Sequence, residues 1–250
     1  MKRYGLIIAN PGEFGRENYC EGVNKDVSNY ENFLRSPVGG AWNKLEINVL
    51  NKPSTQDVRI AIEQAKLADY AFIVFAGHGY YSAGKRSTIL HLRPGVEIDS
   101  AELRQGAKKQ TVILDCCRKI ERPMLVEKRA ALTFAEDATS RMSAANCRKY
   151  FDREIESCSE SLVVIHSCSI DQTAGDNSER GGHYSYSLID CTNDWASGLS
   201  FDPAHYYSRS IVKAHESAAV HVSRLSGNRQ VPQIEKPRSE PYFPFGIVAW

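Results

Sequence analysis

Six short apolar runs, separated by segments with helical patterns, constrain the fold of this chain more than any other feature. The runs are rich in β-branched and aromatic residues, are bounded by turn-forming residues, and occupy positions 4–9, 45–50, 70–76, 111–114, 162–165 and 243–249. Continuous apolar runs of this kind are typical of strands buried on both faces. The helical segments lie at 24–35, 54–67, 100–108, 184–195 and 203–224. This alternation predicts an α/β fold with a mostly parallel six-stranded sheet between helices.

The composition is that of one globular domain spanning residues 1–250. Hydrophobic residues make up 42% of the chain and charged residues 24%, as in ordinary folded proteins. The net charge of +1 creates no field that attracts a phosphate backbone, so we expect no nucleic-acid partner. No apolar stretch approaches the roughly 20 residues that cross a bilayer, and the run behind Met1 is too short for a signal peptide. We therefore expect no membrane contact and a cytoplasmic location, where seven irregularly spaced cysteines would be reduced thiols.

Residues 118–160 differ from the rest of the chain because they are rich in Lys, Arg and Glu and contain no strand-like run. One interpretation is a solvated insertion that combines a helix with a loop. The other is a regulatory linker that flanks the functional site and is cleaved after basic residues. The sequence leaves both interpretations open.

A histidine and a cysteine each follow an apolar run at its carboxyl end. The third run leads into a Gly-His-Gly motif at 77–79, and the fourth leads into an Asp-Cys-Cys motif at 115–117. Because reactive groups of parallel sheets gather at the carboxyl ends of strands, neighbouring strands would present His78 and Cys117 side by side. An imidazole within reach of a thiol removes its proton and stabilises the thiolate. The pattern predicts a catalytic dyad, although each residue taken alone is more often structural.

The glycines beside the histidine leave room for the backbone of a substrate. The Gly79 amide is then expected to face a developing oxyanion, with the Cys117 amide as the second donor. This arrangement of donors and nucleophile is suited to attack on a carbonyl carbon.

These motifs, in this order, resemble the caspase and metacaspase group of clan-CD cysteine peptidases over most of the chain. Beyond the two motifs above, the similar segments are the first strand at 5–10, Gly-Val-Asn-Lys-Asp-Val at 22–27, Ser-Cys-Ser-Ile-Asp-Gln-Thr-Ala at 167–174 with the glycines at 181–182, and Arg-Gln-Val-Pro-Gln at 229–233. The resemblance implies a caspase-hemoglobinase-like three-layer sandwich of the prokaryotic stand-alone type. The family motif implies that Cys117 is the nucleophile and that Cys116 is a packing residue.

The resemblance also implies the specificity of the site. In metacaspases the aspartate two positions before the nucleophile and another after the first strand line the S1 pocket, and Asp115 and Asp26 match them. A carboxylate pair favours a guanidinium or an ammonium and repels an acid, so we expect protein or peptide substrates with Arg or Lys at P1. The alternative for Asp26 is an acid at a helix start, and for Asp115 a turn residue that ends a strand.

Several positions depart from the metacaspase pattern. Val23 and Ala76 stand where many members have a cysteine and a serine, which predicts a less polar S1 pocket. Arg118 and Lys119 replace the usual His-Ser-Gly after the nucleophile, which alters the local loop. The region after His78 has almost no acids, and because a calcium ion needs several carboxylate oxygens, we expect neither a metal nor another cofactor.

The resulting hypothesis is a cysteine endopeptidase that cleaves after basic residues through a Cys117–His78 dyad. Some members of the family serve cell death or antiviral signalling, and the resemblance implies such a regulated role here. The rival hypothesis is a catalytically silent caspase-like scaffold or binding module. A third is a zymogen that awaits cleavage or an activating protein.

Overall fold

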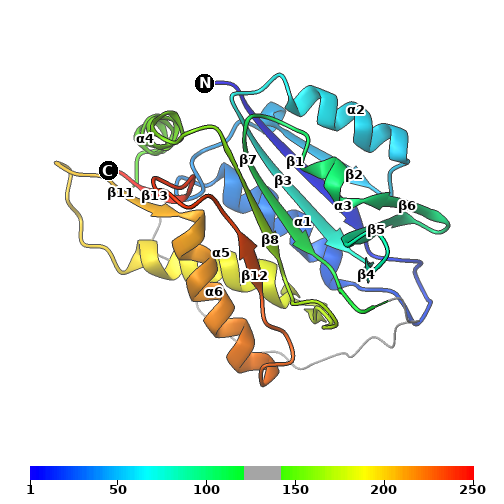
Figure 1. The fold of residues 1–250 in the computed structure, drawn as a ribbon. Coiled ribbons are helices and arrows are strands. Elements are labelled where there is room, and N and C mark those ends of the chain that lie inside the picture. Colours follow the sequence, from blue (N-terminus) through cyan, green and yellow to red (C-terminus); the bar gives the residue numbers. More distant parts are fainter. Residues whose placement is uncertain (121–141) are drawn as a thin grey trace.

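The centre of the molecule is a six-stranded sheet with strand order β12-β8-β7-β3-β1-β2 (Figure 1). The structure is a computed structural model that describes residues 1–120 and 142–250. Five neighbouring strands pair in parallel, and β12 joins β8 at the edge in the antiparallel direction. The prediction of a mostly parallel six-stranded sheet is thus confirmed. The strands are β1 (Arg3–Asn10), β2 (Ile47–Asn51), β3 (Tyr70–Gly77), β7 (Lys109–Asp115), β8 (Ser161–His166) and β12 (Gln233–Glu235).

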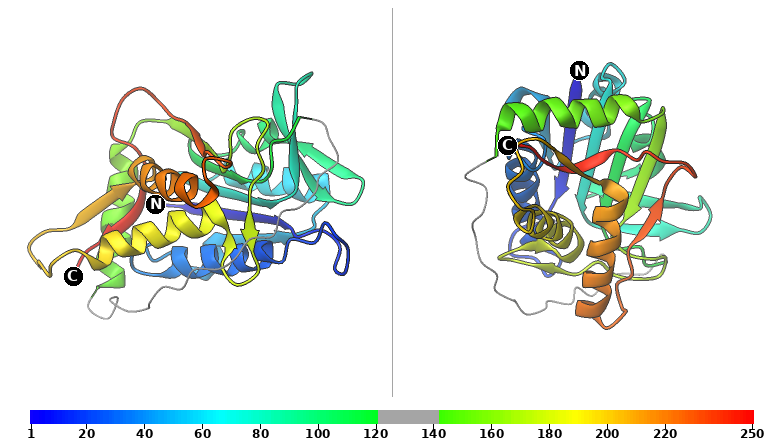
Figure 2. Two further views of the ribbon diagram at one scale, coloured as in Figure 1. Left: turned by 90° about the horizontal axis from the view of Figure 1, so that it is seen from below. Right: turned by 90° about the vertical axis from the view of Figure 1, so that its left-hand side faces the viewer.

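Helices pack on both faces of the sheet, which explains why its inner strands are continuous apolar runs (Figure 2). Along β1, Leu6 and Ile8 contribute to one buried cluster, and Ile7 between them contributes to the other. The first cluster includes side chains of α2 (Thr55–Ala65) and α3 (Ser100–Leu103). The second includes side chains of α1 (Gly22–Arg35), α4 (Ala144–Ser157), α5 (His183–Ser197) and α6 (Ile211–Ser226).

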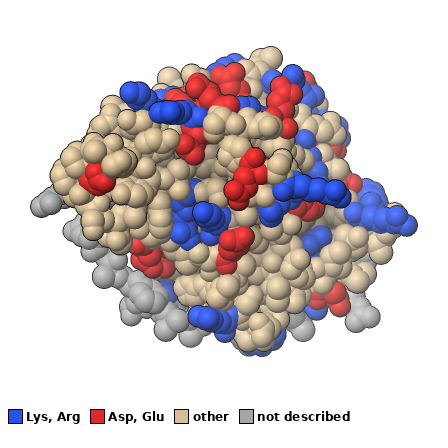
Figure 3. Space-filling model, turned by 60° about the vertical axis from the view of Figure 1, so that its left-hand side comes forward, with Lys and Arg blue, Asp and Glu red and all other residues tan. Residues whose placement is uncertain are grey.

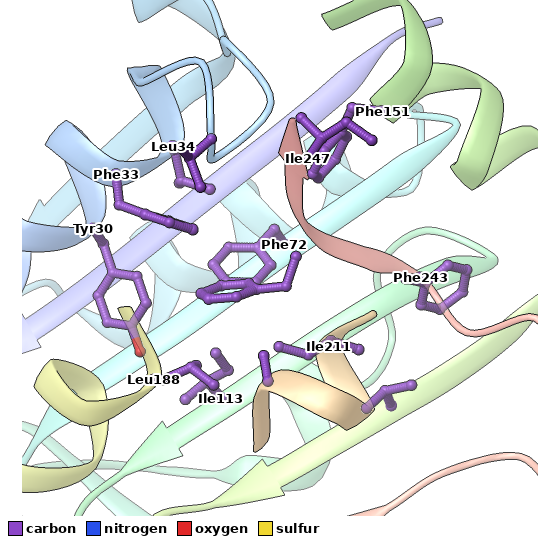
Figure 4. Packing of buried hydrophobic residues seen from close by; sticks show 14 of the residues in the cluster. Tyr30, Phe33, Leu34, Phe72, Ile113, Phe151, Leu188, Ile211, Phe243 and Ile247 are labelled. Carbon is purple, nitrogen blue, oxygen red and sulfur yellow. The ribbon is translucent and has the colours of Figure 1, made fainter. Parts of the chain in front are cut away.

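Aromatic side chains fill much of the second cluster. Figure 4 shows Phe72 and Ile113 of the sheet in one group with Tyr30 and Phe33 of α1 and Leu188 of α5. The rings of Phe33 and Phe245 stack with their centroids 4.6 Å apart. This packing fixes α1 and α5 on the same face of the sheet, above the strands that carry the candidate dyad.

The last apolar run folds differently from the prediction. It forms β13 (Pro244–Val248), but this strand pairs with β11 (Tyr207–Ser210) in a separate two-stranded sheet. Its side chains Phe245 and Ile247 are buried in the second cluster. The edge place in the main sheet belongs to β12, whose three residues form no apolar run, and the helix expected over 203–224 begins only at Ile211.

A three-stranded antiparallel sheet follows the candidate histidine and was not predicted. It consists of β4 (Gly79–Ser82), β5 (Ser87–Arg93) and β6 (Val96–Asp99). The helix expected over 100–108 is limited to α3. The two remaining short strands, β9 (Asp176–Asn177) and β10 (Gly181–Gly182), pair with each other between β8 and α5.

The charged stretch 118–160 contains α4 in its second half. Cys147, Phe151 and Ile155 on one face of α4 are buried in the second cluster, so this helix packs into the fold as an integral part. The linker expected within the same stretch falls mainly on residues 121–141, which lie outside the described residues.

The surface shows charges of both signs. On the face drawn in Figure 3, Lys and Arg side chains are interspersed with Asp and Glu. Within the described part of the chain, no helix has both the length and the apolar character that a membrane span requires.

Candidate active site

The register of the central sheet places the two expected catalytic residues at the same edge. Strands β3 and β7 are parallel neighbours, and Ala76 is aligned with Asp115. His78 and Cys117 each follow two residues later, so both lie just beyond the carboxyl ends of adjacent strands. Both side chains line one cavity, together with Asp26 and Asp115. The remaining lining residues are Cys20, Val23, Gly77, Thr173, Ala174, Gly175, Asp176, Gly182, His183, Ser226, Arg229 and Gln230.

His78 is held by the loop that follows β1. Its Nε2 atom lies 2.6 Å from the backbone oxygen of Asn18, so this nitrogen carries the proton and donates it to the carbonyl. That bond selects one tautomer and leaves Nδ1 as the acceptor. Burial lowers the pKa of His78 below its ordinary value, and the bond to Asn18 partly opposes that effect. The imidazole is therefore neutral at neutral pH and able to accept a proton.

Gly77 brings the backbone into position for this arrangement. Its φ angle is +151°, a region that residues with a side chain rarely adopt. A Cβ atom at this position would lie 2.6 Å from the backbone oxygen of Asn10. A side chain at Gly77 would therefore displace β1 or the His78 backbone.

Cys117 is buried against the segment that follows β8. Its Sγ accepts a hydrogen bond from the Ala174 amide at 3.3 Å, and the thiol lies 3.7 Å from the Ala174 oxygen. Burial raises the pKa of Cys117 to about 11, and the carboxylates of Asp115 and Asp176 act in the same direction. The described side chains of Cys117 and His78 do not hydrogen bond to each other. The thiol is therefore protonated in the resting site.

The neighbours of Cys117 in sequence have structural roles. Cys116 is 1% exposed and belongs to the first buried cluster, as expected for a packing residue. Arg118 points away from the cavity, since its Nε donates to Thr88 at 3.1 Å and its guanidinium lies over the Tyr81 ring. Lys119 donates to the backbone oxygen of Asp171. Arg118 and Lys119 thus hold the loop after Cys117 in place through contacts with neighbouring segments.

Gly79 begins β4 and is aligned with Leu90 of β5. It does not contribute to the cavity lining, although it directly follows His78. A Cβ atom on Gly79 would lie 2.9 Å from the sulfur of Cys116, which gives a packing reason for glycine here. Its expected role as an oxyanion donor stays a prediction.

Asp26 and Asp115 form a buried carboxylate pair at the base of the cavity. Asp26 lies on α1 and is 2% exposed, and Asp115 ends β7 and is 5% exposed. Burial is the main cause that raises the pKa of both groups, and the Asp115 charge raises that of Asp26 further. Among the described residues, neither carboxylate has an ion-pair partner.

The amino-terminal end of α5 donates hydrogen bonds to both carboxylates, and the Ser167 side chain after β8 also bonds to Asp115. The Gly182 amide donates to Asp26 at 2.8 Å, and the Ser185 amide and hydroxyl donate to Asp115 at 3.1 and 2.6 Å. A Cβ atom on Gly182 would lie 2.5 Å from an Asp115 oxygen. The sequence signal for this contact was the Gly-Gly pair at 181–182, but its partners were not predicted.

Gln230 is a second residue whose role the sequence analysis missed. It is 2% exposed, accepts a hydrogen bond from the Gly175 amide at 3.0 Å and donates to the Ser167 oxygen at 2.9 Å. These bonds tie the segment that contacts Cys117 to the end of β8. The Arg-Gln-Val-Pro-Gln run was the signal that marked this position.

The two other positions that were expected in the S1 pocket differ in whether they line the cavity. Val23 lines the cavity, whereas Ala76 is buried behind it in a small cluster with Ala9. Within residues 1–120 and 142–250, no group of three or more His, Cys, Asp or Glu side chains is arranged to hold a metal ion.

Comparison with known proteins places this chain in a family. A family model of the caspase domain matches residues 2–243, and a comparison with curated proteins gave no match. The crystal structure of caspase-1 from Spodoptera frugiperda is similar, with a TM-score of 0.58 and 13% sequence identity over 94% of this chain and 88% of that chain. A sequence identity of 13% supports a similarity of fold alone. The predicted caspase-like α/β sandwich is thereby confirmed. The chain therefore belongs to the caspase-domain family, which is a family of cysteine peptidases.

Proposed function

We propose that the protein is a cysteine endopeptidase that cleaves peptide bonds after Arg or Lys. The observation that supports it most is the carboxylate pair beside Cys117. Buried ionised groups are costly unless they are paired, and among the described residues Asp26 and Asp115 form no ion pair, although the nearby His183 favours the charged form of Asp115. A guanidinium or ammonium group entering the cavity supplies an ion-pair partner, whereas an acidic P1 side chain is repelled.

The proposed chemistry uses the Cys117 thiol and the neutral imidazole of His78. The thiol proton moves to His78 as Sγ bonds to the substrate carbonyl carbon, and the amides of Gly79 and Cys117 stabilise the oxyanion. His78 then gives the proton to the departing amine as the C–N bond breaks. Water cleaves the resulting thioester, which releases the acid and restores the thiol. The Asn18 carbonyl orients the imidazole throughout.

The resting geometry supports activation by substrate. A thiol with a pKa of about 11 is almost entirely protonated at neutral pH, so the nucleophile is not stored as a thiolate. Binding of the P1 cation compensates the negative carboxylates that raise this pKa, and rotation of Sγ away from Ala174 brings it toward the substrate carbonyl. Catalysis and P1 recognition are thereby coupled.

A catalytically silent scaffold is the alternative, and one observation favours it. His78 and Cys117 have separate hydrogen-bond partners, Asn18 and Ala174, and do not contact each other through a hydrogen bond. A protein that only binds a basic peptide would need the carboxylate pair but no proton transfer.

A set of matched fluorogenic peptides that differ only at P1 separates these functions. We expect kcat/KM for Arg and Lys to exceed that for Asp or citrulline by at least about 10²-fold, because a buried charge pair is worth several kcal/mol and each 1.36 kcal/mol is tenfold. Citrulline keeps the shape of Arg without its charge. Preference for Asp would contradict the proposed specificity. No cleavage of any peptide, together with calorimetric binding of the Arg peptide, would favour the scaffold.

A further inference from the structure

A short chain of hydrogen bonds leads from Asp115 into the core behind the cavity. The Ser185 hydroxyl donates to Asp115 at 2.6 Å, and the Tyr30 hydroxyl donates to the Ser185 oxygen at 3.1 Å. Tyr30 and Ser185 are both 0% exposed. Figure 4 shows the Tyr30 hydroxyl directed toward α5. This chain has no access to solvent, so water does not replace a donor that is removed.

The two hydroxyl groups donate their hydrogen bonds in the same direction, from Tyr30 to Ser185 and from Ser185 to Asp115. Ser185 has a single hydroxyl proton, and Tyr30 occupies an acceptor site on the same oxygen. Because Tyr30 donates to that oxygen, the Ser185 proton is directed toward Asp115. Hydrogen bonds in such chains polarise one another. The hydroxyl of Tyr30, which does not touch the cavity, therefore acts on the carboxylate through Ser185.

We propose that Ser185 and Tyr30 are positioning residues that hold Asp115 ionised and oriented for the P1 cation. This inference rests on the proposed function and adds two residues to the specificity site. A buried carboxylate that lacks donors takes up a proton and then attracts a cation poorly. Burial raises the pKa of Asp115, and the hydrogen bonds from Ser185 and from the Ser167 side chain oppose that effect, with the Ser185 hydroxyl the largest of them.

Other charged and titratable groups around Asp115 also affect its ionisation. Asp26 on α1 opposes ionisation by repulsion, and His183 on α5 favours it. The further groups with which Asp115 interacts electrostatically are Tyr30, Tyr184, Cys116, Cys117 and Cys168. Ser185→Ala leaves all of these groups in place, whereas Tyr30→Phe and Tyr184→Phe each remove one phenol hydroxyl.

Binding of n-butylguanidinium, a P1 mimic without a reactive group, tests this proposal independently of catalysis. Its Kd is measured by calorimetry for the full chain across the pH range in which the protein stays folded. Ser185→Ala is expected to weaken binding at least about tenfold near the acidic end and to move the pH midpoint up by about one unit, because a hydrogen bond to a charged group is worth about 1.5–3 kcal/mol. Tyr30→Phe is expected to shift the midpoint in the same direction by less.

Tyr184→Phe is the matched control. Tyr184 is also a fully buried phenol, on α5 next to Ser185, but its hydroxyl bonds to His215 at 2.9 Å and is outside the chain. This variant loses a buried hydrogen bond yet should keep the wild-type midpoint. Equal midpoints in the Ser185, Tyr30 and Tyr184 variants would overturn the positioning role. Failure of the wild-type protein to bind n-butylguanidinium would instead contradict the proposed P1 preference.

Discussion

Replacing Cys117 with alanine is expected to lower kcat for an Arg-P1 peptide by roughly four to six orders of magnitude, as loss of a covalent nucleophile does in other peptidases. The variant has no atom that can form the acyl intermediate, and the nearby thiol of Cys116 points into the first buried cluster. Initial rates measured with concentrated enzyme, alongside the wild-type protein diluted to the same signal, quantify the loss.

Cys116→Ala provides the control for this substitution. Both cysteines are adjacent, free and buried, so the two variants remove the same atom from nearly the same depth. We expect Cys116→Ala to keep kcat within about tenfold of wild type, with some loss of stability from the small cavity. Comparable losses of kcat in both variants would show that the assignment of the nucleophile is wrong.

Neutralising the carboxylate pair is expected to have the second largest effect. Asp26→Asn or Asp115→Asn should lower kcat/KM for an Arg-P1 peptide by roughly 30- to 5000-fold, since removing one partner of a buried charge pair costs about 2–5 kcal/mol. Asparagine keeps an oxygen that accepts the α5 amide, so the backbone around Gly182 and Ser185 is preserved. The loss should be smaller for citrulline, which carries no charge.

The same substitutions should make the unliganded protein more stable at neutral pH. Each carboxyl has a folded-state pKa above its ordinary value of 3.8, so the folded state binds the proton more tightly than the unfolded state. Stability then falls as pH rises from the unfolded-state pKa to the folded-state pKa, so burial of each carboxyl lowers the free energy of unfolding at neutral pH. Thermal unfolding should show a higher Tm for Asp26→Asn together with its lower activity.

Asp190→Asn is the control for both measurements. Asp190 lies on α5 and is partly buried, with a raised pKa and a hydrogen bond to Tyr186, but it does not line the cavity. Its replacement should leave the preference for Arg over citrulline unchanged. If Asp190→Asn lowers that preference as much as Asp26→Asn does, the specificity does not reside in the carboxylate pair.

The places of the candidate dyad residues in the fold followed from the sequence because they depend on local rules. The carboxyl ends of parallel strands lie at the same edge of a sheet. The strands that precede His78 and Cys117, β3 and β7, are parallel neighbours. The cap of α2 is equally local, since Ser54 and Asp57 at its start exchange hydrogen bonds.

The hydrogen bonds that hold Asp115 in place were not predictable in the same way. Ser185 bonds to Asp115 and Tyr30 bonds to Ser185, from two helices that are far apart in sequence, and neither helix shows a pattern that marks these positions. The edge strand β12 was missed because a short exposed strand has no apolar run. β13 was placed in the wrong sheet because burial alone does not determine which strand it pairs with.

Labelling with a peptidyl acyloxymethyl ketone that carries Arg at P1 tests the joint action of the thiol and the imidazole most directly. The reagent forms an S–C bond and releases a carboxylate, and digestion followed by mass spectrometry locates the adduct. We predict one adduct at Cys117 in the wild-type protein and labelling at least about 10²-fold slower in His78→Ala. Labelling of Cys20 or Cys191 instead, or an unchanged rate at Cys117 without His78, would contradict a dyad at this edge of the sheet.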